Sequence, residues 1–425
     1  MTLTVFVASL IAMIILGIPI AFALLASGVA LMYYLDIFDT QIVAQNLIKG
    51  ADNFPLMAIP FFILAGELMN KGGMSRRMVN FALSLVGHIR GGLGYVTIIA
   101  GVLLAGLSGS AVADTAALGA VLIPMMVKAG YKRNRSTGLV AASGIIAPVL
   151  PPSIPMIIFG ITGGVSITKL FIGGIVPGLL MGIGLMITWW LITRNEQVEV
   201  YTRKSFREML IASKEAVWAL FLPVIIVGGL RGGIFTPTEA GVVAAFYALL
   251  VGTIIYRELN VKDLYKVLVD SAKTTSVVMF LVAAAMVPAW LIAFANIPMQ
   301  LANSLGSLIE NPLLLLILIN IIVLFIGMAM DLTPIILILT PVLMPIITEA
   351  GIDPVYFGVL LVLNCSIGLL TPPVGSVLNV ACSIGKVSMA EVMRGIWPFL
   401  LVKLIILLLL VFFPSIVTVP IDWLT

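Results

Sequence analysis

The sequence predicts an all-α polytopic membrane protein, built as an inverted-topology repeat with two re-entrant helical hairpins. Three observations predict this fold. The 425 residues are 61% hydrophobic and 10% charged, with a mean hydropathy of +1.21. The two halves of the chain match each other at a constant offset, and each half has a Pro-Pro pair inside apolar sequence. A composition of this kind leaves no segment polar enough to form a separate soluble domain.

Apolar runs long enough to span a bilayer account for most of the chain. A spanning helix needs roughly 20 apolar residues, and such runs recur from residue 4 to residue 420 with short polar breaks. The first run has no Lys or Arg before it and is longer than a signal-peptide core, so we expect a retained span. The formal charge of +4 comes from basic residues in short loops beside spans, which indicates membrane orientation and not nucleic-acid binding.

An internal repeat divides the chain. Residues 106–130 match residues 327–351 at an offset of 221, and the same offset places Pro151-Pro152 on Pro372-Pro373. One offset held over nearly 50 residues indicates duplication. We therefore predict a first repeat at 1–193, a charged, partly helical linker at 194–215 and a second repeat at 216–425.

Loop charges predict that the two repeats have opposite orientations. The loop at 128–135 has four basic residues and no acid, which predicts a cytoplasmic position. Its counterpart at 349–356 has two acidic residues and no base, so it should lie outside. Equivalent loops on opposite sides are typical of secondary transporters with inverted repeats.

The Pro-Pro pairs predict breaks in membrane helices. Each pair removes two backbone donors and disfavours helix at the preceding residue. Unpaired backbone in lipid costs several kcal/mol per group, so a break survives only in protein or beside water. We predict re-entrant hairpins near 137–165 and 356–384, with the Pro-Pro pairs at tips that meet near the bilayer midplane. A simple kink is the alternative, which the matched positions disfavour.

Small polar residues accompany each predicted hairpin. Two interrupted companion stretches, 106–119 and 327–334, carry Asp114 and Asp331 within apolar sequence. An intramembrane carboxylate predicts function, and capping of a half-helix is a compatible alternative. Hydroxyls and freed carbonyls favour a hard alkali cation over a transition metal. The sequence therefore predicts sodium-coupled uptake of an organic anion.

Amphipathic stretches at 70–90 and 257–275 predict interfacial helices that brace the moving part. Other classes fit less well. The G-x-G-D surroundings of intramembrane aspartyl proteases are absent, as is a phosphate-binding G-x-x-x-x-G-K-[ST] loop. A channel fits the composition, but tips entering from opposite faces suit alternating access better. We predict a transporter and not an enzyme.

Five motifs extend this interpretation: "GLSGSAVAD", "PPSIPMII", "GGIFTPTEAG", "MDLTP" and "NCSIGLLTPPVG". In this order and spacing, the chain resembles the large membrane (M) subunit of tripartite ATP-independent periplasmic (TRAP) transporters. The resemblance implies an elevator-type ion-transporter fold with a scaffold part and a mobile transport part. It also implies Na⁺-driven import of an organic acid, such as a C4-dicarboxylate or sialic acid, across the bacterial inner membrane. The implied partners are a periplasmic substrate-binding protein and a small four-helix membrane subunit.

The resemblance also implies site residues. The first sodium site would use Ser108 and Ser110, with backbone around Ala147, Leu150 and Pro152. The second would use Asp331, Thr333, Gly368 and Thr371. Candidate substrate contacts are Asp114 and Ser166, together with Ser153 and Asn379 beside the tips. Ala147 and Pro148 depart from the usual family pattern, which affects the first-site carbonyls. A stand-alone sodium/carboxylate symporter of related fold is the alternative.

Overall fold

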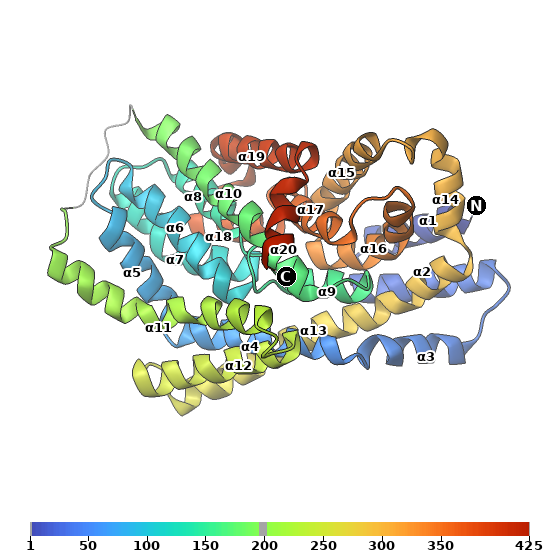
Figure 1. The fold of residues 1–425 in the computed structure, drawn as a ribbon, viewed down its shortest axis with the longest axis horizontal. Coiled ribbons are helices and arrows are strands. Elements are labelled where there is room, and N and C mark those ends of the chain that lie inside the picture. The colour runs from blue at the N-terminus through green and yellow to red at the C-terminus, as the bar shows by residue number, and fades with distance from the viewer. Residues whose placement is uncertain (1, 195–201, 425) are drawn as a thin grey trace.

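The computed structural model describes residues 2–194 and 202–424, and the regular structure of these residues is helical (Figure 1). The helices before the gap are α1 (Thr2–Ile15), α2 (Ile20–Tyr34), α3 (Thr40–Ala51), the 3₁₀ turn η1 (Phe54–Met57), α4 (Ala58–Lys71), α5 (Met74–Val86), α6 (Gly92–Ser108), α7 (Ala111–Lys128), α8 (Arg133–Gly144), α9 (Ile154–Thr162) and α10 (Ile167–Thr193). Those after it are α11 (Phe206–Arg231), α12 (Pro237–Leu250), the π turn η2 (Val251–Ile255), α13 (Val261–Phe294), α14 (Ile297–Leu305), the 3₁₀ turn η3 (Gly306–Leu308), α15 (Pro312–Ala329), α16 (Leu332–Glu349), α17 (Pro354–Gly368), α18 (Ser376–Gly385), α19 (Met389–Phe412) and α20 (Ser415–Leu424).

Nine helices in the described ranges are long and apolar enough to cross a bilayer. Many carry large apolar side chains on their outer surface, including Trp190, Phe246 and Phe325, each more than half exposed. Exposed apolar faces of this extent suit a lipid environment, and backbone groups in lipid must be paired within helices. The prediction of an all-α polytopic membrane protein is confirmed.

The matched stretches of sequence have matching helix boundaries. Both α7 and α16 are 18 residues long, and their first residues, Ala111 and Leu332, are 221 apart. Both are capped by a polar side chain at the preceding residue. The helices α8 and α17 also begin 221 apart, and the Pro151-Pro152 and Pro372-Pro373 bonds that follow them are both cis.

The Pro-Pro segments break their helices as predicted, but the expected hairpins at 137–165 and 356–384 differ from the observed packing. The helix α8 packs on α6, α7 and α19, whereas α9 packs on α16, α10 and α17. In Figure 1, α8 and α18 lie to the left while α9 and α17 lie to the right. The chain therefore continues onward through each Pro-Pro segment and does not fold back. Proline and the residue before it favour extended backbone, which interrupts a helix without reversing its direction.

The chain reverses instead at the companion stretches. The helices α6 and α7 pack against each other and are joined at Gly109, whose φ of +60° suits glycine. The helices α15 and α16 also contact each other, and Met330 and Asp331 join them. In Figure 1 the first pair lies at the left of the molecule and the second at the right. We call these pairs the first hairpin (92–128) and the second hairpin (312–349).

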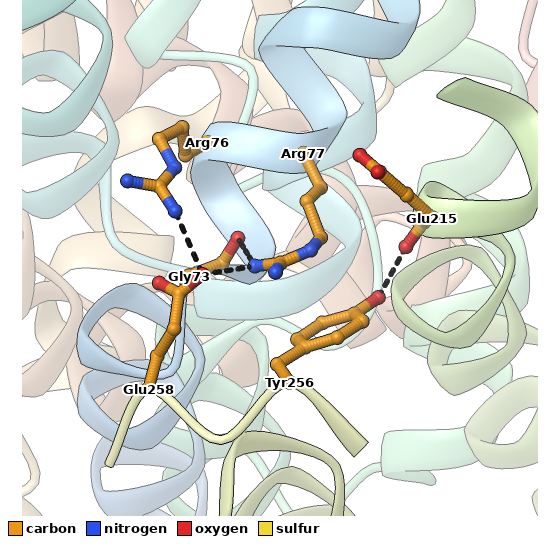
Figure 2. Close-up of polar contacts among 6 residues, drawn as sticks. All are labelled: Gly73, Arg76, Arg77, Glu215, Tyr256 and Glu258. Carbon is orange, nitrogen blue, oxygen red and sulfur yellow. Dashed lines mark hydrogen bonds and ion pairs between the residues drawn. The ribbon is translucent and has the colours of Figure 1, made fainter. Parts of the chain in front are cut away.

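A polar cluster links α5 to residues 256–258, between η2 and α13, and these residues to α11, as Figure 2 shows. The Glu258 carboxylate accepts from Arg76 Nη2 and Arg77 Nη1, each at 2.7 Å. The Arg77 guanidinium lies 3.7 Å from the centroid of the Tyr256 ring, a cation–π contact. The Tyr256 hydroxyl donates to the backbone oxygen of Glu215 on α11 at 2.5 Å. Half-burial raises the pKa of Tyr256 to about 12, so the hydroxyl keeps its proton to donate.

The predicted interfacial helices and the predicted linker agree with the structure only in part. The stretch 70–90 contains the short helix α5 at Met74–Val86, but residues 257–275 form no separate helix, because α13 begins at Val261 and continues to Phe294. The predicted linker at 194–215 overlaps the start of α11, where Ser205 and Glu208 form a capping box. Residues 195–201 of that linker lie outside the described residues.

Candidate functional site

A cavity of about 310 Å³ lies where the reversals of the two hairpins meet. We call it the tip cavity. The first hairpin contributes residues 108–113, the second contributes residues 331–333, and the first Pro-Pro segment contributes Pro148, Ile154 and Pro155. The helices α4 and α13 form most of the remaining wall, and Leu369 after α17 completes it. Four predicted sodium ligands line it together: Ser108, Ser110, Asp331 and Thr333.

The first hairpin holds two linked serines and a buried carboxylate. Ser110 caps α7, with its hydroxyl accepting from the Ala113 amide at 3.4 Å. The Ser108 hydroxyl accepts from the Ser110 amide at 3.1 Å and donates to Asp114 Oδ1 at 2.5 Å. Asp114 is 1% exposed, and its Oδ2 has no hydrogen-bond partner among the described residues. Asp114 therefore lies behind Ser108 and outside the cavity wall, which differs from the predicted direct substrate contact.

The backbone predicted for the first sodium site lies against this reversal. Ala147 is fully buried and its neighbour Pro148 lines the tip cavity. The Pro152 carbonyl packs closely on Gly109. A Cβ added to Gly109 would lie 2.5 Å from the Pro152 carbonyl oxygen. Leu150 faces away, toward a separate apolar cavity bounded by α10 and α11.

The second hairpin is arranged similarly. Asp331 Oδ1 accepts from the Leu332 amide at 2.9 Å, capping α16, and from the Ser376 hydroxyl at 3.3 Å. Gly368 lies against Gly327, where an added Cβ would be 2.7 Å from the Gly327 Cα. The Thr371 hydroxyl donates to the Ile367 oxygen at 3.1 Å. Gly368 and Thr371 do not line the tip cavity, although Leu369 between them does.

The remaining predicted substrate residues lie elsewhere. Ser153 is buried, donates to the Pro148 oxygen and accepts from the Met156 amide at 3.2 Å. Ser166 is exposed and caps α10, accepting from the Lys169 amide at 3.3 Å. Asn379 is exposed on α18, where its Nδ2 donates to the Val374 oxygen at 2.5 Å. None of the three lines the tip cavity.

The wall opposite the hairpins was not among the residues predicted from the sequence. This wall contains Glu67 and Asn70 of α4 and Thr274 of α13. Glu67 and Asn70 are three residues apart in the apolar stretch "FFILAGELMNK", so they share one helix face. Two polar residues at this spacing in an apolar helix could have indicated a polar face toward the site.

A second cavity, of about 420 Å³, adjoins the tip cavity and shares Glu67, Asn70 and Ala113 with it. We call it the side cavity. One wall is polar, with Lys71 of α4 and Ser75 and Arg76 of α5. The other is apolar, and its residues come mainly from α7: Ala116, Ala117 and Val121. Its cations distinguish it from the tip cavity, whose described lining contains no Lys, Arg or His.

The donor atoms of the tip cavity suit a hard cation. They are hydroxyl, carboxylate and amide oxygens, together with backbone next to the helix breaks. Within residues 2–194 and 202–424, no group of three or more His, Cys, Asp or Glu could hold a metal ion. Oxygen donors of low total charge favour an alkali cation over a transition metal.

The chain shares extensive sequence with known proteins. Residues 7–416 match the family model described as "Tripartite ATP-independent periplasmic transporter, DctM component". The chain is 54% identical to the 2,3-diketo-L-gulonate TRAP transporter large permease protein YiaN of Escherichia coli, over 100% of both chains. It is 41% identical to the sialic acid TRAP transporter large permease protein SiaM of Vibrio cholerae, over 94% of this chain and 93% of that one. It is 39% identical to the C4-dicarboxylate TRAP transporter large permease protein DctM of Pseudomonas aeruginosa, over 90% of each.

A solved structure shares the fold. The crystal structure of the Alcanivorax borkumensis YdaH transporter matches with a TM-score of 0.65 at 16% identity, covering 89% of this chain and 88% of that one. At that identity the likeness concerns the fold alone. The sequence matches extend over nearly the whole chain, and they show that it belongs to the TRAP transporter family as the DctM component, a multi-pass large permease protein and not an enzyme.

Proposed function

We propose that this protein imports an organic acid across the bacterial inner membrane, driven by a sodium gradient. In this proposal a periplasmic substrate-binding protein delivers the acid, and a small four-helix membrane subunit is a permanent partner. The observation that carries it is the tip cavity, where two hairpin reversals and a helix break bring oxygen ligands together. The named substrates of three relatives, diketogulonate, sialic acid and C4-dicarboxylate, are all organic acids, which supports the substrate class.

Two sodium ions would bind at the reversals. The first would use the Ser108 and Ser110 hydroxyls with backbone around Ala147, Leu150 and Pro152. The second would use Asp331 and Thr333 with backbone or hydroxyl at Gly368 and Thr371. The unpartnered Oδ2 of buried Asp114 supports a need for positive charge near the first site. Bound sodium would supply the charge that attracts the carboxylate of the substrate.

The substrate would lie in the tip cavity between two parts of the protein. The mobile transport part would comprise the two hairpins and the broken helices α8–α9 and α17–α18, and the scaffold would include α4, α5 and α11–α13. The division of the cavity wall between these two groups supports an elevator movement. The matching helix boundaries support an inverted repeat at 1–193 and 216–425, with the reversals at Ser108–Ser110 and Met330–Asp331 as the re-entrant tips.

Reconstitution tests the proposal. The purified protein with its small subunit is placed in liposomes, and uptake of radiolabelled organic acid is measured with and without external sodium and binding protein. Uptake that needs both supports the tripartite proposal. Sodium-dependent uptake without a binding protein or small subunit would support a stand-alone symporter instead. Uptake that is equal in sodium and potassium would overturn the sodium coupling.

A further inference from the structure

Glu67 is a carboxylate that no ion site proposed above uses. It lies on α4, is partly buried, and lines both the tip cavity and the side cavity. It therefore stands where the two cavities adjoin. A carboxylate inside an apolar helix is costly to keep there, which points to a functional reason for its presence.

The charges around the tip cavity are negative. Glu67 faces this cavity from α4 and Asp331 faces it from the second hairpin, and no basic residue is in its described lining. The charged groups that act most on Glu67 are Asp270 of α13 and Lys71 of α4. Lys71 lines the side cavity but not the tip cavity. The Asp270 carboxylate forms an ion pair with Lys273, with Oδ1 3.9 Å from Nζ. Within the described residues Glu67 forms no ion pair at 4.0 Å or less.

An organic anion and a cation respond oppositely to such a cavity. The negative potential from Glu67 attracts a cation and opposes a carboxylate. Lys71 in the side cavity attracts the carboxylate, and so does the net positive charge that remains when Arg76 and Arg77 share Glu258. The anion is thus favoured beside the tip cavity and disfavoured inside it. Its entry into the tip cavity requires bound cations that compensate the negative charge.

We propose that Glu67 determines the coupling between the two solutes: it makes occupancy of the tip cavity by the organic anion conditional on bound sodium. This inference rests on the proposed function. Glu67 is a specificity-determining residue here, because its fixed charge sets the balance between anion and cation without being one of the proposed sodium ligands.

Glu67→Gln gives the test, since it keeps the shape and removes the charge. At about 10 Å and an effective dielectric constant of about 40, one unit charge changes the affinity for a singly charged ion by about fourfold. We therefore expect two opposite shifts in reconstituted uptake. The concentration for half-maximal uptake should fall about fourfold for a singly charged substrate and about 16-fold for a dianion such as succinate, and the sodium concentration for half-maximal uptake should rise about fourfold.

The substrates are radiolabelled succinate, sialic acid and 2,3-diketo-L-gulonate, and the best transported of them is used. Glu215→Gln is the matched control, because it removes the same charge from α11 at an exposed position outside both cavities. In Glu215→Gln the half-maximal concentrations of substrate and of sodium should both stay within twofold of the wild type. Glu67→Asp retains the charge and should also stay close to the wild type, which separates the charge from the side chain's fit.

The outcomes distinguish this inference from the proposed function. Opposite shifts in Glu67→Gln alone support it. If both constants rise together, Glu67 has a structural role and the inference is overturned. It is also overturned if neither constant moves while wild-type uptake depends on sodium. Wild-type uptake that ignores sodium would defeat the proposed function first, and the inference with it.

Discussion

Single residues at the site combine helix capping with exposure to the tip cavity. Ser110 caps α7 and Asp331 caps α16, and both line the cavity. A capping oxygen accepts one backbone amide and keeps lone pairs free for another partner. Each residue can therefore start its helix and ligate a cation at the same time. The proposed sodium sites would give such side chains a reason to lie within apolar sequence.

Asp331→Asn separates these two roles. Asparagine caps a helix about as well as aspartate, so α16 should keep its start, whereas the negative charge is lost. We expect the sodium concentration for half-maximal uptake to rise about tenfold, which corresponds to about 1.4 kcal/mol of cation binding. Uptake by the reconstituted complex at a series of sodium concentrations measures this.

Asp353→Asn is the matched control for that variant. Asp353 caps α17 by accepting from the Tyr356 amide at 2.7 Å, and it lies outside the tip cavity. The sodium concentration for half-maximal uptake by Asp353→Asn should equal that of the wild type. If the two variants behave alike, Asp331 acts through its cap and not as a sodium ligand.

The sequence identified only one side of the site. Ser108, Ser110, Asp331 and Thr333 could be predicted because small polar residues interrupt apolar helices there, and they line one cavity. Glu67 was missed because its approach to the hairpins depends on the packing of α4 against α6 and α13, which no local pattern specifies. Ser166 caps α10 and lies outside the tip cavity, so its predicted contact with substrate stays a prediction.

At the scale of helices, the sequence predicted where the chain breaks but not its direction afterwards. α17 ends at Gly368, whose carbonyl would need the amide that Pro372 lacks, and α8 ends at Gly144, whose carbonyl would need the amide that Pro148 lacks. The reversals occur instead at Gly109 and at Met330-Asp331. Gly109 has a left-handed backbone that permits a tight turn, and Met330 is extended at the end of α15. Turn chemistry therefore distinguishes a hairpin from an interrupted span, and proline content alone does not.

Close helix packing in the second half yields a prediction about Gly368. An alanine Cβ at this position would lie 2.7 Å from the Gly327 Cα and 2.8 Å from its carbonyl oxygen, so α15 and α17 must separate. Overpacking of this kind typically costs about 1–3 kcal/mol. We expect Gly368→Ala to lower the unfolding temperature of the purified protein by a few degrees and to reduce uptake.

Gly228→Ala on α11 is the corresponding control. Apart from its chain neighbours and the backbone of its own helix, its Cβ would have no described atom within 4 Å, and the residue lies in the interior of a helix. Alanine is the better helix former by about 1 kcal/mol, so this variant should unfold at the same temperature or higher. A lower unfolding temperature in both variants would show that the loss does not come from the contact with Gly327.

At the scale of the whole molecule, the tip cavity joins parts of the chain that are far apart in sequence. Residues 108–113 and 331–333 line it from two hairpins, and Glu67 and Thr274 line it from two further helices. Each sodium ion of the proposed function would contact a hairpin reversal and the Pro-Pro segment of the same half, which lie on separate helices. Its binding free energy therefore adds to the stability of the assembled fold and not to one helix alone.

Sodium should consequently stabilise the protein against heat, and potassium should not. A ligand that binds only the folded state adds about 1.4 kcal/mol at a concentration ten times its dissociation constant. For a chain of this size that corresponds to a rise of about 2 °C in the unfolding temperature. Thermal unfolding in detergent, with NaCl replaced by KCl at constant ionic strength, measures the difference. Asp331→Asn should lose most of it, while Asp353→Asn should keep it. Equal stabilisation by both salts would mean that general screening acts on surface charges such as the Arg76, Arg77 and Glu258 cluster, and that no selective cation site exists in the tip cavity.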